Sequence, residues 1–394
     1  MISRVLVAFG LAILMVVSAV GSYMYLGSRQ SSLAAAPKEP TKASPSPGAF
    51  NLPGTLFVTQ GGAIYALSAG RFHQLTGAAD WTQLADYPGG NLLAVKRSLL
   101  YSDVYIVSRF GRVLKRFTNN SAANSNPDPS KRHWAFYPRL SFNNKLLFMS
   151  WDKPKIGFDV PMSIWAMPVH GTMSDAKLWT VSIDYTGGDM QPLPLPSGAL
   201  MYTKYLYDNN KIVSQIWLTG QPERFYRCGT FCIAPPATQP GIGRPLTTPQ
   251  EDCSQPSLSP DHHTIAMICS RQSQLSYLTL ASFNGSKLGP RRYVITNQLV
   301  AQPTWAPDGT GIAYMAPSRL GEGFQLWFLP KLAYAPPSPS PVPSRTPTPG
   351  APASSPSPVA SPSPVPTPAP VVIKPIQITS NVALDATSPM AWIN

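Results

Sequence analysis

Residues 295–309 read ITNQLVAQPTWAPDG, and residues 378–394 read ITSNVALDATSPMAWIN. Both stretches run from an Ile-Thr pair through an Asn to a Pro and then a Trp: Pro303 with Trp305, and Pro389 with Trp392. The second copy ends after the length of one strand. A repeat that begins and does not finish predicts a circular array, in which strands near the N-terminus complete the last unit. This pattern decides the architecture but identifies no ligand.

Short β-rich runs fill the chain from Gly54 onward. Runs such as TLFVT, AIYAL, KLLFMSW and GIAYMA have strand composition, and each is bounded by Gly, Pro, Asn, Asp or Ser. They group with a period of about 40–60 residues. In three units the first two strands join through SFNN, SPDH or APDG, which are hairpin turn signals. Because no amphipathic helix pattern is visible after residue 30, we expect an all-β fold.

The units that start at Gln255 and Gln302 share a longer motif, Pro-x-(Trp/Leu)-(Ser/Ala)-Pro-Asp, in which Ile-Ala begins four positions after the Asp. This motif resembles the repeat of TolB-like β-propellers, which is also found in the propellers of prolyl-oligopeptidase-type enzymes. It is degraded in the unit at Tyr137, where Phe-Asn-Asn replaces Pro-Asp-Gly. The resemblance implies a propeller fold. Because TolB-like proteins bind other envelope proteins, it also implies a protein-binding role.

The sequence predicts a six-bladed β-propeller. Five blades are expected at residues 80–118, 133–183, 188–247, 252–296 and 300–379. The sixth combines Ser388–Asn394 with Gly54–Thr76, so that the C-terminal strand joins the N-terminal blade and closes the ring. Five or seven blades remain alternatives, because the units at 80–118 and 188–247 carry the motif only weakly.

An apolar run predicts the location of the protein. Arg4 precedes residues 5–26, which are long enough for the roughly 20 residues that cross a bilayer as a helix. We expect residues 1–27 to form a transmembrane signal-anchor and residues 28–53 a flexible linker. A cleaved signal peptide with its site at Ala34–Ala36 is the alternative. Either way the propeller is expected on the extracytoplasmic side of the cell membrane.

Residues 336–370 interrupt the last unit with Pro, Ser, Thr and Ala in low-complexity sequence. Such a segment has too few apolar side chains for a core, so a proline-rich disordered insertion is expected. The propeller domain is then residues 54–335 plus 371–394. The insertion is either a tolerated long loop or a spacer that reaches through cell-wall polymer, and its Ser and Thr residues are possible glycosylation sites.

Four cysteines predict two disulfides in a translocated protein. Cys253 and Cys269 flank a hairpin whose turn centres between Asp261 and His262, which brings them close to facing positions. Cys228 and Cys232 close a short CGTFC loop. A zinc site with four Cys ligands is the alternative, although the spacings are irregular for one.

Residue types that carry catalysis are sparse. Asp261 and Asp308 lie in hairpin turns, where an Asp side chain typically accepts hydrogen bonds from local backbone. The five histidines, which include the adjacent His262 and His263, show no metal-ligand spacing. No nucleophile elbow, HExxH or phosphate-binding loop is present in the sequence. We therefore expect no enzyme activity, no catalytic or metal-binding residues and no cofactor.

The chain is basic, with a formal net charge of +13. One cluster of basic residues stands out and comprises Arg109, Arg112, Lys115, Arg116, Lys131 and Arg132. Outside the cell such a cluster suits lipid headgroups or an anionic wall polymer. The alternative is a solvated rim that keeps the protein soluble. Nucleic acid is not expected as a partner, because no basic-aromatic recognition motif accompanies the charge.

Taken together, these patterns predict a non-catalytic, membrane-tethered propeller that acts as a protein-binding or scaffold module of the bacterial cell envelope. Its expected partners are the membrane, through residues 5–26, and an envelope protein. One alternative is a module that binds envelope polysaccharide or wall polymer. Another is a propeller enzyme with a metal site in the central channel, for which the 18 acidic residues of the chain are few.

Overall fold

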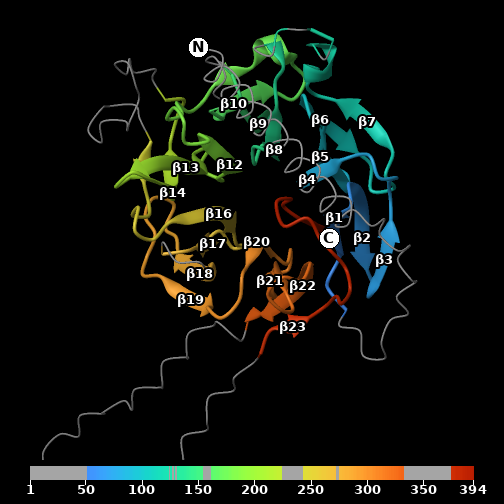
Figure 1. The fold of residues 1–394 in the computed structure, drawn as a ribbon, viewed down its shortest axis with the longest axis vertical. Helices are drawn as coiled ribbons and strands as arrows, with labels where there is room; N and C mark the ends of the chain where they lie inside the picture. Colours follow the sequence, from blue (N-terminus) through green and yellow to red (C-terminus); the bar gives the residue numbers. More distant parts are fainter. Residues whose placement is uncertain are drawn as a thin grey trace, which may run out of the picture. The chain divides into compact units, whose positions relative to one another are not determined.

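In a computed structural model of the chain, the described residues form six antiparallel sheets of four strands, arranged in a ring whose centre we call the channel (Figure 1). The structure describes residues 51–123, 125–126, 128, 131–153, 161–223, 243–271, 275–331 and 374–394. The predicted membrane anchor, most of the linker, the proline-rich insertion and the Cys228–Cys232 pair lie outside these residues. No helix among the described residues has the length and apolar character to span a membrane.

Each sheet is one blade, and we number the blades in chain order. Blade 1 contains β24 (Ala391–Ile393), β1 (Thr55–Gln60), β2 (Ala63–Ser68) and β3 (Arg71–Gln74). Blade 2 contains β4 (Trp81–Tyr87), β5 (Asn91–Arg97), β6 (Ser102–Val107) and β7 (Val113–Arg116). Blade 3 contains β8 (Ala135–Leu140), β9 (Leu146–Trp151), β10 (Ser163–Pro168) and β11 (Lys177–Leu178).

The other three blades repeat the same order from the channel outward. Blade 4 contains β12 (Asp189–Pro194), β13 (Leu200–Asp208), β14 (Lys211–Thr219) and β15 (Arg244–Pro245). Blade 5 contains β16 (Cys253–Leu258), β17 (Thr264–Cys269), β18 (Tyr277–Ser282) and β19 (Arg292–Ile295). Blade 6 contains β20 (Ala301–Trp305), β21 (Gly311–Pro317), β22 (Phe324–Pro330) and β23 (Ile376–Gln377). Among the described residues, two 3-10 turns, η1 (Asn120–Ala123) and η3 (Met173–Asp175), lie between strands.

The count of six blades confirms the prediction, and every predicted unit contains the strands of one sheet. Blade 1 takes strands from both ends of the chain. Its β24 pairs antiparallel with β1, and Phe57 lies opposite Ala391 in the register. The indole N–H of Trp392 also donates a 2.6 Å hydrogen bond to the carbonyl oxygen of Pro53.

The middle strands of the blades contain long apolar runs because both of their faces are covered. All seven residues of β21 are buried, as are Leu92–Val95 of β5. The outermost strands β3 and β7 are exposed along their whole length. A strand that is buried on both faces gains hydrophobic stabilisation on both, which explains runs of apolar residues in place of an alternating pattern.

The hydrophobic core is divided among the gaps between neighbouring blades. One cluster, for example, packs Leu56 and Trp392 of blade 1 against Leu326 and Phe328 of blade 6. Five further clusters fill the gaps between blades 1 and 2, 2 and 3, 3 and 4, 4 and 5, and 5 and 6. Each blade is therefore stabilised by two neighbours, and no single central core exists in the described residues.

Candidate functional site

The innermost strands carry a repeated irregularity that shapes the channel. In five of them the register with the second strand shifts, as expected for a β-bulge. One residue of each bulge has a positive φ between 52° and 56°: Gln83, Tyr137, Gln191, Gln255 and Gln302. Proline follows four of them, at positions 138, 192, 256 and 303. Because a bulge interrupts the ladder of hydrogen bonds, the missing N–H of proline leaves no partner unsatisfied there.

Hydrogen bonds connect these bulges from blade to blade in what we term the bulge ring. In each case the backbone N–H of one bulge donates to the side chain of the preceding blade: Gln83 to Ser388 Oγ (2.6 Å), Tyr137 to Gln83 Oε1 (2.8 Å), Gln255 to Gln191 Oε1 (2.9 Å) and Gln302 to Gln255 Oε1 (2.6 Å). The Gln302 side chain in turn donates to the Ala386 carbonyl (2.9 Å). These bonds fix the inner strands relative to one another around the channel. The Gln-Pro dipeptides were a visible signal for the ring, but the sequence prediction did not use them.

A cavity of about 400 Å³ lies in the channel on the side where the inner strands end, and we call it the channel mouth. Its volume falls within the ordinary range for ligand pockets, about 300–1,000 Å³. Strands from five blades line it, together with Asp86 of the remaining blade. The walls combine three of the prolines that follow the bulges with glutamine, serine and threonine side chains. Such a surface offers both apolar contact and hydrogen-bonding groups.

Arg139, near the end of β8, brings a positive charge into the channel mouth. The side chain is partly buried, and within the described part of the chain no hydrogen bond or ion pair engages it. Burial lowers the pKa of the Arg139 guanidinium, while the carboxylate of Asp86 opposes that shift. Since a guanidinium keeps its proton in proteins, Arg139 remains a cation that is available to an anionic group. The sequence prediction missed this residue, because it lies outside the run of basic residues on β7.

Two aromatic side chains of the channel mouth are in contact with each other. The ring of Phe142, in the turn after β8, meets the ring of His262, in the turn after β16, with centroids 5.2 Å apart and planes at 86°. The two residues belong to blades 3 and 5, which are not neighbours in the ring. The Phe142 side chain is about half exposed, so it lies where a ligand entering the cavity would pass.

The turn aspartates have the structural role that was expected. Asp261 Oδ1 accepts hydrogen bonds from Ser259 Oγ (2.5 Å) and from the backbone N–H of His263 (3.1 Å). Asp308 Oδ1 accepts from the backbone N–H and the hydroxyl of Thr310 (3.0 and 2.7 Å). Among the described residues, no three His, Cys, Asp or Glu side chains are grouped so that they could hold a metal ion.

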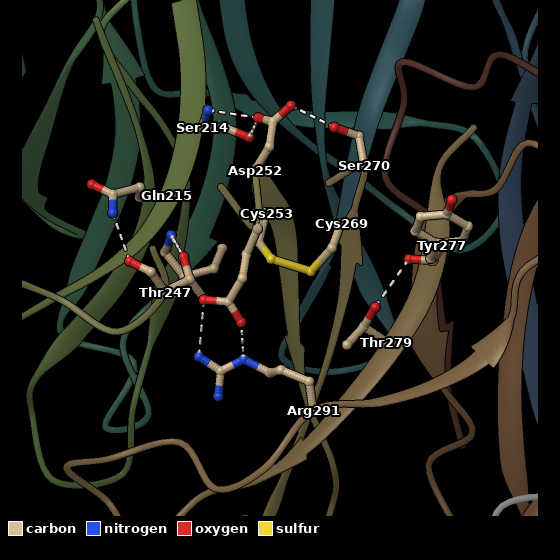
Figure 2. The surroundings of a disulfide bond; sticks show 12 residues. Ser214, Gln215, Thr247, Asp252, Cys253, Cys269, Ser270, Tyr277, Thr279 and Arg291 are labelled. Carbon is tan, nitrogen blue, oxygen red and sulfur yellow. Dashed lines mark hydrogen bonds and ion pairs between the residues drawn. A yellow bond between two sulfur atoms is a disulfide. The ribbon is translucent and has the colours of Figure 1, made fainter. Parts of the chain in front are cut away.

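The predicted disulfide between Cys253 and Cys269 is confirmed (Figure 2). The two residues are direct partners in the register of β16 and β17. The neighbouring Asp252 accepts hydrogen bonds from the N–H and hydroxyl of Ser214 (both 2.8 Å) and from the hydroxyl of Ser270 (2.5 Å). The disulfide thus joins two strands of blade 5, while Asp252 connects that blade to blade 4.

A charged pair that the sequence prediction missed is completely buried between strands of blade 4. Lys204 Nζ lies 2.9 Å from Asp189 Oδ1 and also donates to the carbonyl of Val181 (2.7 Å). Burial raises the pKa of Asp189, and the ammonium of Lys204 opposes this shift. Because both side chains have no solvent exposure, the pair contributes to structure and has no access to a substrate.

The predicted basic cluster is divided between two ends of blade 2. Arg109 and Arg112 lie in the turn between β6 and β7, whereas Lys115 and Arg116 lie on β7. Lys131 and Arg132 follow in the connection to β8, which starts at the other end of that strand. Four of the six residues therefore lie on β7 and in the turn before it, and Lys131 and Arg132 lie in the connection that follows.

Comparison with known proteins supports the fold. No protein-family model and no curated protein matches this sequence. Among solved structures, TolB from Acinetobacter baumannii matches 71% of this chain at 13% identity and a TM-score of 0.48. Hydrazine synthase from Kuenenia stuttgartiensis matches 71% at 9% identity with a TM-score of 0.52, and a gluconolactonase from Xanthomonas campestris matches 70% at 12% identity with a TM-score of 0.41.

These matches cover 62% of the TolB chain, 44% of the hydrazine synthase chain and 82% of the gluconolactonase chain. At such low identities they concern the fold alone. The sequence repeat corresponds in the structure to the four-stranded blades of a six-bladed propeller.

Proposed function

We propose that this protein is a non-catalytic, membrane-tethered propeller whose channel mouth binds an extended segment of an envelope protein. The tether is the apolar run at residues 5–26, and the propeller lies on the extracytoplasmic side. The observation that supports the proposal is the cavity of about 400 Å³ with one available guanidinium. A cavity of this size accommodates a few residues of an extended chain.

The chemistry of the walls suits a peptide. Proline rings at Pro192, Pro256 and Pro303 offer rigid apolar contact, and the bulge ring beneath them offers glutamine side chains. Arg139 supplies a charge for a carboxylate, either from an acidic side chain or from a chain terminus. Because the bulge ring holds the inner strands in place, the cavity is pre-organised and binding costs little ordering of the receptor.

The proposal is tested by placing a photo-crosslinking amino acid at Phe142 in the full chain, in its native cells. We expect a covalent adduct with an envelope protein. Incorporation at Leu320 is the control, since this side chain is 75% exposed in the β21–β22 turn, at the opposite end of the strands from the channel mouth. The Arg139→Gln variant should reduce the Phe142 adduct, because a hydrogen bond to a charged group contributes about 1.5–3 kcal/mol.

Two other outcomes would replace the proposal. Adducts that contain only polysaccharide, together with co-sedimentation with purified wall polymer, would identify a polymer-binding module. A metal ion retained by the purified chain, with hydrolytic activity lost upon its removal, would identify a propeller enzyme. Equal protein adducts at Phe142 and Leu320 would show that the channel mouth is not the binding site.

A further inference from the structure

The outer edge of blades 1 and 2 carries a dense positive charge that is not neutralised within its own segments. Five exposed cations lie there, on β3, on β7 and in the turn before β7: Arg71, Arg109, Arg112, Lys115 and Arg116. Residues 63–79 and 104–119, which contain all five, include no Asp or Glu. The nearby Asp103 is buried and accepts hydrogen bonds from Thr118 and Asn120. It therefore does not neutralise the surface.

Exposed apolar side chains are interleaved with these cations. Phe110 is 75% exposed, Leu114 51% and Val113 47%. The guanidinium of Arg109 lies 4.9 Å from the centre of the Phe110 ring. We call the five cations together with Phe110, Val113 and Leu114 the cationic edge. Aromatic and aliphatic side chains among Lys and Arg are the composition that binds at the surface of a membrane.

Contacts between the two blades make this edge continuous. Gly111, in the turn before β7, lies directly against the backbone of Leu75, which follows β3. Lys115 Nζ donates a 3.0 Å hydrogen bond to the carbonyl of Val169 in blade 3. Arg116 donates a 2.9 Å hydrogen bond to Ser121 Oγ. Arg109 and Arg112, in the turn, are therefore the cations best placed to reach a partner.

The chain enters the propeller at the same end of the blades as this turn. The first residue of β1, Thr55, pairs with Ile393 at the end of the innermost strand, beside the channel mouth. In blade 2 the turn after β4 lies at this end, and a side chain at Gly90 would sit 3.7 Å from Arg109. Residues 27–49 precede the propeller and span at most about 75 Å when extended. With the membrane tether of the proposed function, on which this step rests, that length is enough for the cationic edge to reach the bilayer.

We propose that the cationic edge docks on an anionic lipid surface. Cations near such a surface each strengthen binding about fivefold, and exposed Phe110 and Leu114 insert at the level of the headgroups. An anionic wall polymer would meet the charge but would leave the apolar side chains in water. The inference is independent of the ligand in the channel mouth.

The test uses the full chain reconstituted in nanodiscs and hydrogen–deuterium exchange of residues 105–117. With phosphatidylglycerol in the nanodisc we expect slower exchange than with phosphatidylcholine alone, and the difference should decrease as salt is raised. Arg109→Gln with Arg112→Gln should weaken docking about 25-fold. The control is Lys211→Gln with Lys287→Gln, which removes equal charge from exposed positions on blades 4 and 5. It should leave the exchange unchanged.

A separate variant distinguishes lipid from polymer. Phe110→Ser with Leu114→Ser should weaken docking on the anionic nanodisc while retaining all the charge. The proposal would be overturned if the slower exchange of residues 105–117 did not depend on lipid charge. It would also be overturned if the slower exchange persisted in Arg109→Gln with Arg112→Gln. Protection by soluble wall polymer on phosphatidylcholine nanodiscs, without protection by phosphatidylglycerol, would assign the edge to the polymer. Melting temperatures equal to wild type would show that each variant is folded.

Discussion

The backbone N–H of Gln83 donates a 2.6 Å hydrogen bond to the hydroxyl oxygen of Ser388, although 305 residues separate them in the chain. Gln83 belongs to the bulge of β4, and Ser388 precedes β24, the strand that pairs with β1. The bond therefore extends the bulge ring from the C-terminal strand to blade 2. Thr82 Oγ1 adds a 3.0 Å hydrogen bond to Asp385 Oδ2 at the same junction.

Deleting residues 371–394 should unfold the propeller. This segment contributes β23, β24 and the buried side chains of Leu384, Met390 and Trp392. Each large apolar side chain stabilises the fold by about 1.5–3 kcal/mol, and a domain typically has only about 5–15 kcal/mol in total. Circular dichroism during heating checks this. Deleting residues 340–366 is the control and should leave the melting temperature unchanged. A cooperative transition at the wild-type temperature after the first deletion would show that ring closure is unimportant.

Replacing both Cys253 and Cys269 with Ala should lower the melting temperature by about 5–10 °C. The disulfide joins residues 16 apart in sequence, and closing a loop of that size contributes about 3 kcal/mol by restricting the unfolded chain. Calorimetry under oxidising and reducing conditions checks this. The Ser270→Ala variant, which removes a neighbouring hydrogen bond but retains the disulfide, should have a smaller effect. An unchanged transition in the double variant would contradict the prediction.

The Lys204→Met variant should lose about 3–5 kcal/mol of stability near neutral pH, because it leaves the Asp189 carboxylate buried without its partner. Its loss should be smaller at pH 5. Burial already raises the pKa of Asp189 above that of an unfolded Asp, and removing the ammonium raises this pKa further. When a carboxyl has a raised pKa in the folded state, the protein loses stability as pH rises from the unfolded-state pKa to the folded-state pKa. Acid therefore favours the folded variant.

Urea unfolding at pH 5 and pH 8 measures this difference. Adding Asp189→Asn to Lys204→Met should recover part of the stability at pH 8. Lys211→Met, at an exposed position on the same hairpin, should have no effect at either pH. A Lys204→Met variant whose loss is equal at both values would show that Asp189 does not titrate in this range.

Alkaline solution should destabilise the protein through Tyr137. Burial raises the pKa of this tyrosine to about 12, compared with about 10 in an unfolded chain. Between these values the unfolded state releases a proton that the folded state retains. Stability therefore falls as pH rises from about 10 to about 12, by up to about 1.4 kcal/mol per pH unit.

The Tyr137→Phe variant should show a shallower decline of unfolding free energy between pH 9 and pH 11.5. Part of the decline should remain, because burial also raises the pKa of Tyr205 and Tyr314. Tyr185→Phe, at an exposed position, should retain the full wild-type slope. Identical slopes for Tyr137→Phe and wild type would indicate that Tyr137 is reached by solvent before unfolding.

Much of the fold was predictable because the residues that specify its turns and strands lie close together in the sequence. The turns at Asp261 and Asp308 are held by hydrogen bonds within two residues, so their signals appear in a short stretch of sequence. The Cys253–Cys269 pairing followed from counting outward from one such turn. The candidate site was less predictable. Arg139 directly follows the bulge of β8, two residues after Tyr137, and a bulge changes which face a side chain takes.

The sequence by itself predicted six blades, with five or seven as alternatives, and also their boundaries and one disulfide, because apolar runs and turn residues act through neighbours in the chain. Tertiary structure decided which side chains meet: Arg139 with the channel mouth, Lys204 with Asp189, and Gln83 with Ser388. These contacts depend on how sheets twist and close around the channel. The charge of the cationic edge was visible in the sequence. Its position at the same end of the blades as the entry of the chain, and its exposed Phe110 and Leu114, followed only from the tertiary structure.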